Sequence, residues 1–338
     1  MSPRLFAVVT TIQEPTDCVR GLADALRGLD APLVAVGDRK GPASFDLDGA
    51  RFLPIDEQLE MPFALAAALP EGHYARKNLG YLLAMGEGAA CIYETDDDNA
   101  PLPSWAPRER RVMAQKADPR PWLNVYRLFT DELLWPRGFP LDLVSDPATF
   151  EHDPELPREQ VDAPIQQGLA DQAPDVDAVW RLILDRPLCF ERRASVWLPP
   201  GTWCPFNSQS TWWWPPAWPL MYLPSLCSFR MTDIWRSFVA QRCLWEFGCG
   251  LVFHAAEVAQ ERNVHNLLRD FRDEVPGYLG NAELVRQLAE LALGPGPAAA
   301  GANLLRCYER LVEGGFFPAE ELDLVRAWLD DVARVASA

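Results

Sequence analysis

Three consecutive aspartates, Asp96, Asp97 and Asp98, are the residues of this chain best suited to binding a divalent cation. They follow the apolar run Cys91-Ile92-Tyr93, which predicts a buried strand that ends just before them. Adjacent carboxylates repel one another and are costly together unless they are hydrated or neutralised by a cation. Hard oxygen ligands suit Mn²⁺ or Mg²⁺, ions that proteins usually share between carboxylates and substrate phosphates. A solvated acidic turn is the alternative, but the position after a strand favours a metal held by Asp96 and Asp98, with Asp97 facing the substrate.

Basic residues stand close to these aspartates in the predicted fold. Arg76, Lys77 and Asn78 lie at the start of a predicted helix, residues 78–87, that leads to the aspartates. Cations on this rim, together with helix-terminal N–H groups, would hold a diphosphate. Solvated basic residues at a helix start are the alternative, although the helix dipole slightly disfavours cations there. We therefore predict that all three residues bind substrate.

Two further strand ends carry polar side chains that suit a nucleotide. Thr10 and Thr11 end the first predicted strand, and Asp38 and Arg39 follow the second. Ligands of open α/β sheets bind outside the carboxyl ends of the strands, so both loops fall on the edge that holds the aspartates. Asp38 suits hydrogen bonds from a base or ribose, and Arg39 suits a phosphate. Such turns are also common without a ligand, so the convergence of three strand ends is the stronger indication.

Asp233 is the candidate for a general base. It lies just before a predicted helix, residues 234–247, where an N-cap role alone would explain a carboxylate. A base that deprotonates an acceptor hydroxyl also needs a partly buried carboxylate. Both roles therefore stay open for Asp233.

Trp213 and two histidines also admit both a structural and a binding role. Trp213 belongs to a tryptophan-rich segment, residues 197–218, that would form either a sugar-stacking platform or core packing. His254, between two apolar residues, is typical of a core histidine rather than a metal ligand. His265 is the other histidine considered for completing the metal site.

The elements that must position these residues alternate over the first hundred residues. Apolar runs predict strands at residues 5–12, 33–36 and 90–93, and helical spacing predicts helices at residues 17–29 and 78–87. This order implies a parallel sheet covered on both faces. Residues 101–224 are rich in proline and predict long loops with short elements. Beyond Thr232 the chain predicts helices at residues 234–247 and 263–273 and after residues 281, 302 and 318.

Composition and charge exclude several classes of protein. The 338 residues are 49% hydrophobic and 23% charged, which is ordinary for a globular protein that buries a core. A formal net charge of −17 argues against a nucleic-acid partner. The sequence begins without a signal peptide, and no window approaches 18 uninterrupted apolar residues, so we expect a cytoplasmic protein with no membrane span.

Several blocks of this sequence resemble the STELLO family of plant Golgi glycosyltransferases. The blocks Tyr74–Leu82 and Ile92–Asn99 carry the resemblance, and Trp135–Leu141 and Phe229–Ser237, which contain Arg137 and Asp233, are similar too. The resemblance spans almost the whole chain. It implies an α/β, GT-A-like (Rossmann-like) fold with a mixed central sheet, a nucleotide-sugar donor, and a divalent metal at residues 96–98. Arg137 is included among the substrate-binding candidates on this resemblance alone.

We predict two regions in the chain. Residues 1–250 would form the GT-A-like domain, with a nucleotide-sugar-binding half at 1–100 and an acceptor half at 101–250. Residues 251–338 would form a helical C-terminal region.

The predicted function is metal-dependent transfer of a sugar from a nucleotide-sugar, most simply a UDP-sugar, to a hydroxyl of a carbohydrate or protein acceptor. Mn²⁺ or Mg²⁺ would stabilise the leaving diphosphate. The family is distantly similar to UDP-arabinopyranose mutases, so a UDP-sugar mutase or a self-glycosylating protein is one alternative. A non-catalytic nucleotide-sugar-binding scaffold is another. Nucleotidyl transfer is disfavoured because the chain lacks a glycine-rich phosphate loop.

Overall fold

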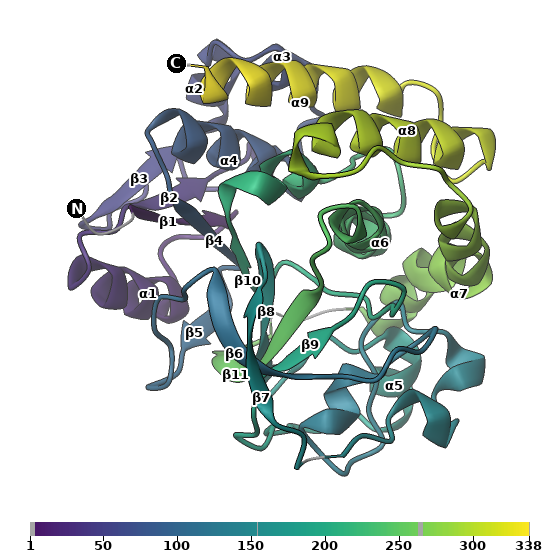
Figure 1. The fold of residues 1–338 in the computed structure, drawn as a ribbon. Helices are drawn as coiled ribbons and strands as arrows, with labels where there is room; N and C mark the ends of the chain where they lie inside the picture. Colours follow the sequence, from purple (N-terminus) through teal and green to yellow (C-terminus); the bar gives the residue numbers. More distant parts are fainter. Residues whose placement is uncertain (1–3, 154, 263–265, 338) are drawn as a thin grey trace.

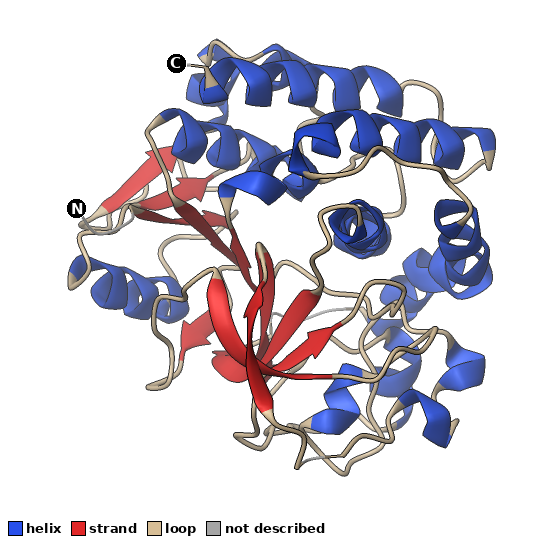
Figure 2. Cartoon of the chain, viewed as in Figure 1, coloured by secondary structure: helices blue, strands red, loops and turns tan. Residues whose placement is uncertain are grey.

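One mixed sheet of 11 strands runs through the molecule, with helices on both of its sides (Figures 1 and 2). The computed structural model describes residues 4–153, 155–262 and 266–337. The strand order is β3-β2-β1-β4-β10-β8-β11-β9-β6-β7, and β5 pairs with β11. The strands are β1 Leu5–Thr10, β2 Leu33–Val36, β3 Ala50–Leu53, β4 Cys91–Thr95, β5 Asn99–Pro101, β6 Arg111–Lys116, β7 Arg158–Asp162, β8 Ile165–Asp171, β9 Val196–Leu198, β10 Ser210–Trp213 and β11 Leu251–Gln260.

The helices lie in two sets along the chain. Short and medium helices follow the first strands, and longer ones follow β10 and β11. They are α1 Asp17–Arg27, α2 Ile55–Glu60, α3 Ala64–Ala68, α4 Lys77–Gly86, α5 Ala178–Ile183, α6 Thr232–Trp245, α7 Leu267–Ala289, α8 Ala300–Glu313 and α9 Glu321–Ala336. The predicted α/β class with a mixed central sheet is confirmed. No helix in the described ranges is both long and apolar enough to cross a bilayer.

The first four strands form the parallel part of the sheet that the sequence predicts. β1 pairs in parallel with β2 on one side and β4 on the other, and β2 pairs in parallel with β3. Alternate side chains of β1 enter separate cores: Val8 shares one core with Leu79 of α4, and Val9 shares another with Leu22 of α1. Both faces are therefore covered, which explains why β1 reads as a continuous apolar run.

Gly80 allows α4 to lie directly on the sheet. A Cβ at this position would come within 2.6 Å of Val8 Cγ1 and 2.8 Å of Val36 Cγ2. Overpacking of this kind costs about 1–3 kcal/mol, so we expect Gly80→Ala to lower the free energy of unfolding by that amount. Gly86 ends the same helix and is the matched control, because its added Cβ would meet Val335 Cγ1 at an ordinary 3.6 Å. Urea unfolding should show a loss for Gly80→Ala alone; an equal loss in both variants would contradict the close approach.

The second part of the sheet is mixed and differs from the prediction at residues 251–260. We predicted that residues 251–338 are helical, but residues 251–260 form β11, which lies inside the sheet, parallel to β8 and antiparallel to β9. Most β11 side chains are buried on both faces, so the strand shows no polar alternation. Its alanine-rich composition does not distinguish a buried strand from a buried helix.

The helices that follow β11 also depart from the prediction in one respect. Two helices were expected, at residues 263–273 and after residue 281, but α7 runs unbroken from Leu267 to Ala289 through Pro276. Residues 263–265 of the first lie outside the described residues. Farther along, α9 lies beside α3 and α4 at the top of Figure 1, and α8 packs against α9. The Asp331 carboxylate of α9 accepts hydrogen bonds from the backbone N–H groups of Ala64 and Leu65, so the last helix packs directly on the N-terminal half of the chain.

Candidate functional site

The carboxyl ends of β1, β4, β8 and β11 lie at the same edge of the sheet. β1 and β4 are parallel, β10 runs antiparallel to both β4 and β8, and β8 is parallel to β11. Asp96, Asp97 and Asp98 directly follow β4 at this edge. Gln260, the last residue of β11, also ends here and contacts Asp98. Sequence positions more than 160 residues apart therefore meet at one place.

Each of the three aspartates has a different polar neighbour. The half-buried Asp96 accepts a hydrogen bond from the Lys77 ammonium group at 2.8 Å. The Asp97 carboxylate accepts one from the Thr11 hydroxyl at 2.6 Å. Burial raises the pKa of both Asp96 and Asp97, and Lys77 and Thr11 respectively oppose that rise. A cation at this edge would stabilise the ionised carboxylates further.

The surroundings of Asp98 fit a hard cation. Its carboxylate accepts hydrogen bonds from the amide nitrogens of Gln260 at 3.0 Å and Asn99 at 3.1 Å. The amide oxygens of Gln260 and Asn99 are buried and have no hydrogen-bond partner. Unmatched buried oxygens beside a carboxylate are ligands of the type that Mg²⁺ and Mn²⁺ prefer.

No group of three or more His, Cys, Asp or Glu side chains is arranged to hold a metal in the described part of the chain. A cation at this edge would therefore be held by one or two carboxylates, neighbouring amide oxygens, and groups supplied by substrate or water. This is the usual pattern for Mg²⁺ bound together with substrate phosphates.

Of Arg76, Lys77 and Asn78, which were predicted to bind substrate, only Lys77 contacts one of the three aspartates. Its buried ammonium group donates to the Thr95 carbonyl as well as to Asp96. Arg76 ends a 3-10 turn, Tyr74–Arg76, and donates to the Gln58 side chain and to the Ala66 and Leu69 carbonyls. Asn78 exchanges two hydrogen bonds with the backbone of Leu223. Because neighbouring residues of a helix project about 100° apart, the three side chains enter three different parts of the molecule.

The loop after β2 does not reach the aspartates with its charged side chains. Both carboxylate oxygens of Asp38 accept hydrogen bonds from the Gly72 N–H, at 2.8 and 3.0 Å. The exposed Arg39 pairs with Glu71 and lies 3.5 Å from Asp56. Both side chains thus contact the segment after α3, and their contacts with a nucleotide stay predictions. Thr10, in contrast, is half-buried at the end of β1, next to Thr11.

Trp213 cannot form a sugar-stacking platform. It is fully buried in β10, and its indole N–H donates to Glu94 at 2.9 Å. The guanidinium of Arg236 lies 5.1 Å from its ring centre and forms an ion pair with Glu94 at 2.8 Å. The prediction that Trp213 binds substrate is therefore wrong, because a fully buried ring offers no face to a sugar.

Asp233 and Arg137 form a buried ion pair. The Arg137 guanidinium donates to both carboxylate oxygens of Asp233, at 3.0 and 2.9 Å, and to both of Asp175, at 2.8 Å. Asp233 lies in the first turn of α6, and its N–H donates to the Tyr74 hydroxyl. Burial alone would raise the pKa of Asp233, but Arg137 outweighs burial and holds that pKa below its usual value. A carboxylate held in this way is a weaker base than an unpaired one.

Sequence reasoning missed Arg262, which follows the end of β11. Its guanidinium donates to the Ala173 and Pro174 carbonyls, at 3.2 and 2.8 Å. No carboxylate within the described ranges forms an ion pair with it. Burial, with Arg181 as the next cause, lowers its pKa to about 10, so it stays charged at neutral pH. Because residues 251–338 were predicted as a helical region without a strand, the sequence did not indicate that Arg262 would reach the strand edge that carries Asp98.

His254 is a core residue of β11. Its ring nitrogens lie 2.7 Å from the Ser195 hydroxyl and 2.9 Å from the Gln166 amide oxygen, and the side chain is buried. It therefore does not complete a metal site. His265 lies outside the described residues.

Comparison with known proteins shows which sequences this chain is similar to. A family model described as STELLO glycosyltransferases matches residues 230–337. The probable glycosyltransferases STELLO2 and STELLO1 of Arabidopsis thaliana are 30% and 28% identical to the chain, each over 98% of its length. The chain is related to the STELLO glycosyltransferases. It spans 45% and 44% of the lengths of those two proteins.

The residues of the candidate site fall both inside and outside the match to the STELLO family model. The matched range, residues 230–337, contains Asp233, Arg236, Gln260 and Arg262. The three aspartates after β4 lie outside that range but inside the alignments with the two Arabidopsis proteins, which cover nearly the whole chain. The resemblance predicted from the sequence is confirmed.

One solved structure with a weak overall likeness is the glucosyl-3-phosphoglycerate synthase of Mycobacterium tuberculosis in complex with Mn²⁺, UDP and phosphoglyceric acid. The match covers 83% of this chain and 78% of that one, with 11% identity and a TM-score of 0.41. This likeness is too weak to carry residue roles from that enzyme to this chain.

Proposed function

We propose that this chain transfers a sugar from a nucleotide-sugar, a UDP-sugar in the simplest case, to a hydroxyl of a carbohydrate or protein acceptor, with Mn²⁺ or Mg²⁺ as cofactor. Its relationship to the STELLO glycosyltransferases supports the reaction class. The observation that carries the proposal is the arrangement around Asp98, a carboxylate at the carboxyl edge of the sheet that accepts hydrogen bonds from two side-chain amides, each of which has an unmatched buried oxygen. The cytoplasmic location expected from the sequence stays a prediction.

Asp96 and Asp98 are the proposed metal-holding residues, and the amide oxygens of Asn99 and Gln260 are the nearest additional ligands. The bound metal would supply charge stabilisation to the departing diphosphate. Lys77 holds the Asp96 carboxylate in place through its buried hydrogen bond. Thr11 holds Asp97 in the same way.

The donor phosphates need cations to overcome the net charge of −17. We propose Arg262 for this role, in place of the predicted Arg76 and Arg39, whose hydrogen bonds are directed elsewhere. The fully buried Lys77 acts through its hydrogen bond to Asp96. Thr10 and Thr11 remain proposed contacts of the nucleoside. Asp233, held by Arg137, is proposed to position the start of α6 rather than to act as the base.

Calorimetric titration with a panel of nucleotides and nucleotide-sugars, with and without Mn²⁺, tests this function. We expect metal-dependent binding of a uridine or guanosine diphosphate species, followed by transfer or slow hydrolysis of the matching nucleotide-sugar. Binding without turnover over a broad acceptor panel would contradict the transferase proposal and favour the scaffold. Ring-size interconversion of the sugar without an acceptor would favour the mutase. If no nucleotide or nucleotide-sugar bound, the proposal of a donor site would itself be contradicted.

Two substitutions test which arginine contacts the donor phosphates. Arg262→Gln tests the residue proposed from the structure, and Arg39→Gln tests the residue predicted from the sequence. A lost charge-assisted hydrogen bond costs about 1.5–3 kcal/mol, so we expect Arg262→Gln to weaken UDP binding about 10- to 100-fold. Arg39 is exposed and paired with Glu71 in the segment after α3, so Arg39→Gln should bind UDP like the unsubstituted protein. The same calorimetric titration with Mn²⁺ measures both variants. Equal losses, or a loss only for Arg39→Gln, would contradict the assignment.

A further inference from the structure

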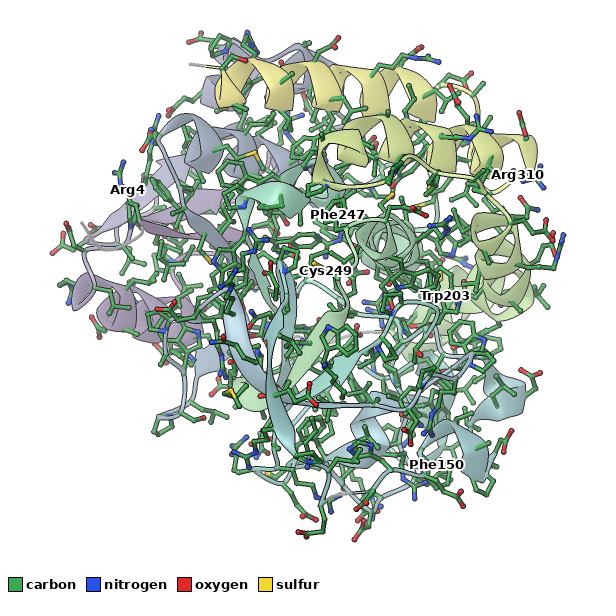
Figure 3. All side chains as sticks on the ribbon, viewed as in Figure 1. Arg4, Phe150, Trp203, Phe247, Cys249 and Arg310 are labelled. Carbon is green, nitrogen blue, oxygen red and sulfur yellow. The ribbon has the colours of Figure 1, made fainter. Side chains whose placement is uncertain are left out.

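An open cavity of about 1010 Å³ lies beside β6 and β9, and half of the residues that line it are charged. Its walls come from β6 and the loop after it, the 3-10 turn Val125–Leu128, residues 148–153, the start of β7, and the segment leading into β9. Phe150, on the wall formed by residues 148–153, is seen in the lower part of Figure 3. The volume reaches the upper end of the range for small-molecule sites.

The cavity is separate from the proposed donor site. Val196, which lines the cavity, pairs with Phe253 of β11, whereas Gln260 at the other end of β11 contacts Asp98. The seven residues from Phe253 to Gln260 span about 23 Å of strand. A molecule in the cavity would therefore bind independently of the donor diphosphate.

Four arginines converge on the cavity although the whole chain carries a net charge of −17. Arg193 pairs with Glu191 at 2.9 Å, and Arg120 lies 3.9 Å from Asp118. In the parts of the chain that the structure describes, Arg127 and Arg158 form no ion pair with a carboxylate. The positive charges of Arg127 and Arg158 are therefore not neutralised by a contacting carboxylate.

Acidic side chains also line the cavity, but they lie at its solvent-exposed rim. The Asp118 and Asp131 side chains are 75% and 92% exposed. The residues Glu151 and Asp153 are exposed as well. Water and salt screen such charges strongly, so they weaken the attraction of an anion to the cavity only in part.

Polar atoms in the cavity wall lack partners within the protein. Both ring nitrogens of His152 and the Nε of Arg127 are buried without a hydrogen bond. The Arg127 guanidinium lies 4.1 Å from the centre of the Phe150 ring, which holds it in place. Burial lowers the pKa of His152, so its neutral ring offers one donor and one acceptor. Leaving such groups unmatched is costly, so they indicate a ligand with both acceptor oxygens and hydroxyl donors.

We propose that this cavity binds a phosphomonoester of a polar small molecule, such as a sugar phosphate, at a second site distinct from the donor site. A phosphomonoester carries about −1.5 to −2 charges at pH 7, which the two unpaired guanidiniums of Arg127 and Arg158 match. The phosphate alone would leave most of the cavity unfilled, so an organic part with hydroxyl groups occupies the remainder and reaches His152. The proposal does not depend on the glycosyltransferase function.

Calorimetric titration of the full chain with glucose 6-phosphate, inorganic phosphate and glucose tests this site. We expect saturable binding of glucose 6-phosphate, weaker binding of inorganic phosphate and none of glucose. Arg127→Gln and Arg158→Gln should each weaken glucose 6-phosphate binding about 10-fold, the effect of one lost charge-assisted hydrogen bond. Arg158 is exposed, so its substitution leaves the core intact. Arg272→Gln, on the exposed side of α7, is the matched control and should bind like the unsubstituted protein.

Competition with UDP and Mn²⁺ separates the two sites. An excess of both should leave glucose 6-phosphate binding unchanged. Displacement by UDP and Mn²⁺ would place the phosphate at the donor edge and overturn the proposal. Absence of any binding by the unsubstituted protein would overturn it as well, and so would binding by Arg158→Gln and Arg127→Gln as tight as that of the unsubstituted protein.

Discussion

Asp98→Asn is expected to lower metal-dependent UDP binding and sugar release about 100-fold, because it removes one of the two charged ligands, Asp96 and Asp98, of the proposed metal site. The amide keeps the shape of the side chain, so the hydrogen-bonding neighbours Gln260 and Asn99 can stay in place. Mn²⁺ titrations of UDP binding and of UDP-sugar hydrolysis measure the effect.

Asp323→Asn provides the control for Asp98→Asn. Asp323 carries the same charge on an exposed turn of α9, with its side chain 83% exposed and 3.3 Å from Arg326. It should bind UDP and Mn²⁺ like the unsubstituted protein. Full metal dependence retained in Asp98→Asn, with the variant folded, would rule out a metal on this carboxylate.

Glu94→Gln is expected to have the largest effect on stability, a loss of about 3–5 kcal/mol in the free energy of unfolding. Glu94 is fully buried in β4 and accepts hydrogen bonds from Arg236, Trp213 and Tyr81. Removing one partner of a buried ion pair leaves the other charge, here Arg236, uncompensated in the interior. Urea unfolding measures the loss.

Asp323→Asn, in the exposed ion pair of Asp323 and Arg326, is also the control for the unfolding of Glu94→Gln. Surface ion pairs contribute little, so Asp323→Asn should unfold like the unsubstituted protein. If Glu94→Gln lost no more than Asp323→Asn, the buried pair would not hold β4 to α6. That result would also reopen the assignment of Trp213 to the core rather than to a sugar.

The parallel half of the sheet was predictable from the sequence because its signals are local. β2 is a continuous apolar run, β1 and β4 each begin with one, and α1 shows a clear helical period with Thr16 as its N-cap. The position of the three aspartates follows directly, since they come immediately after β4. The contact between Lys77 and Asp96 could also be predicted, because β4 is the next strand after α4.

The roles of Arg76 and Asn78 were not predictable in the same way. They flank Lys77 in sequence, but a shift of one residue at the start of α4 turns a side chain by about 100°. Whether a residue faces the aspartates or Leu223 depends on where the 3-10 turn before α4 ends. A sequence pattern does not fix helix boundaries to one residue.

Contacts between residues far apart in the sequence account for the remaining differences between the prediction and the structure. Glu94 and Arg236 are 142 residues apart, and Arg137 and Asp233 are 96 apart. No local pattern indicates that such side chains satisfy each other in the interior, so Asp233 resembled a free base. β11 was missed for a related reason: it is a central strand only because β8 and β9 enclose it. With β11 missed, Gln260 and Arg262 could not be placed beside Asp98.

The most direct test of the proposed donor site is the anomalous scattering of manganese in crystals of the chain grown with UDP and Mn²⁺. The account predicts one anomalous peak in contact with Asp98 and the UDP diphosphate, with Arg262 beside the phosphates. UDP bound without a manganese peak at Asp98, or bound away from the carboxyl edge of β4, would contradict it.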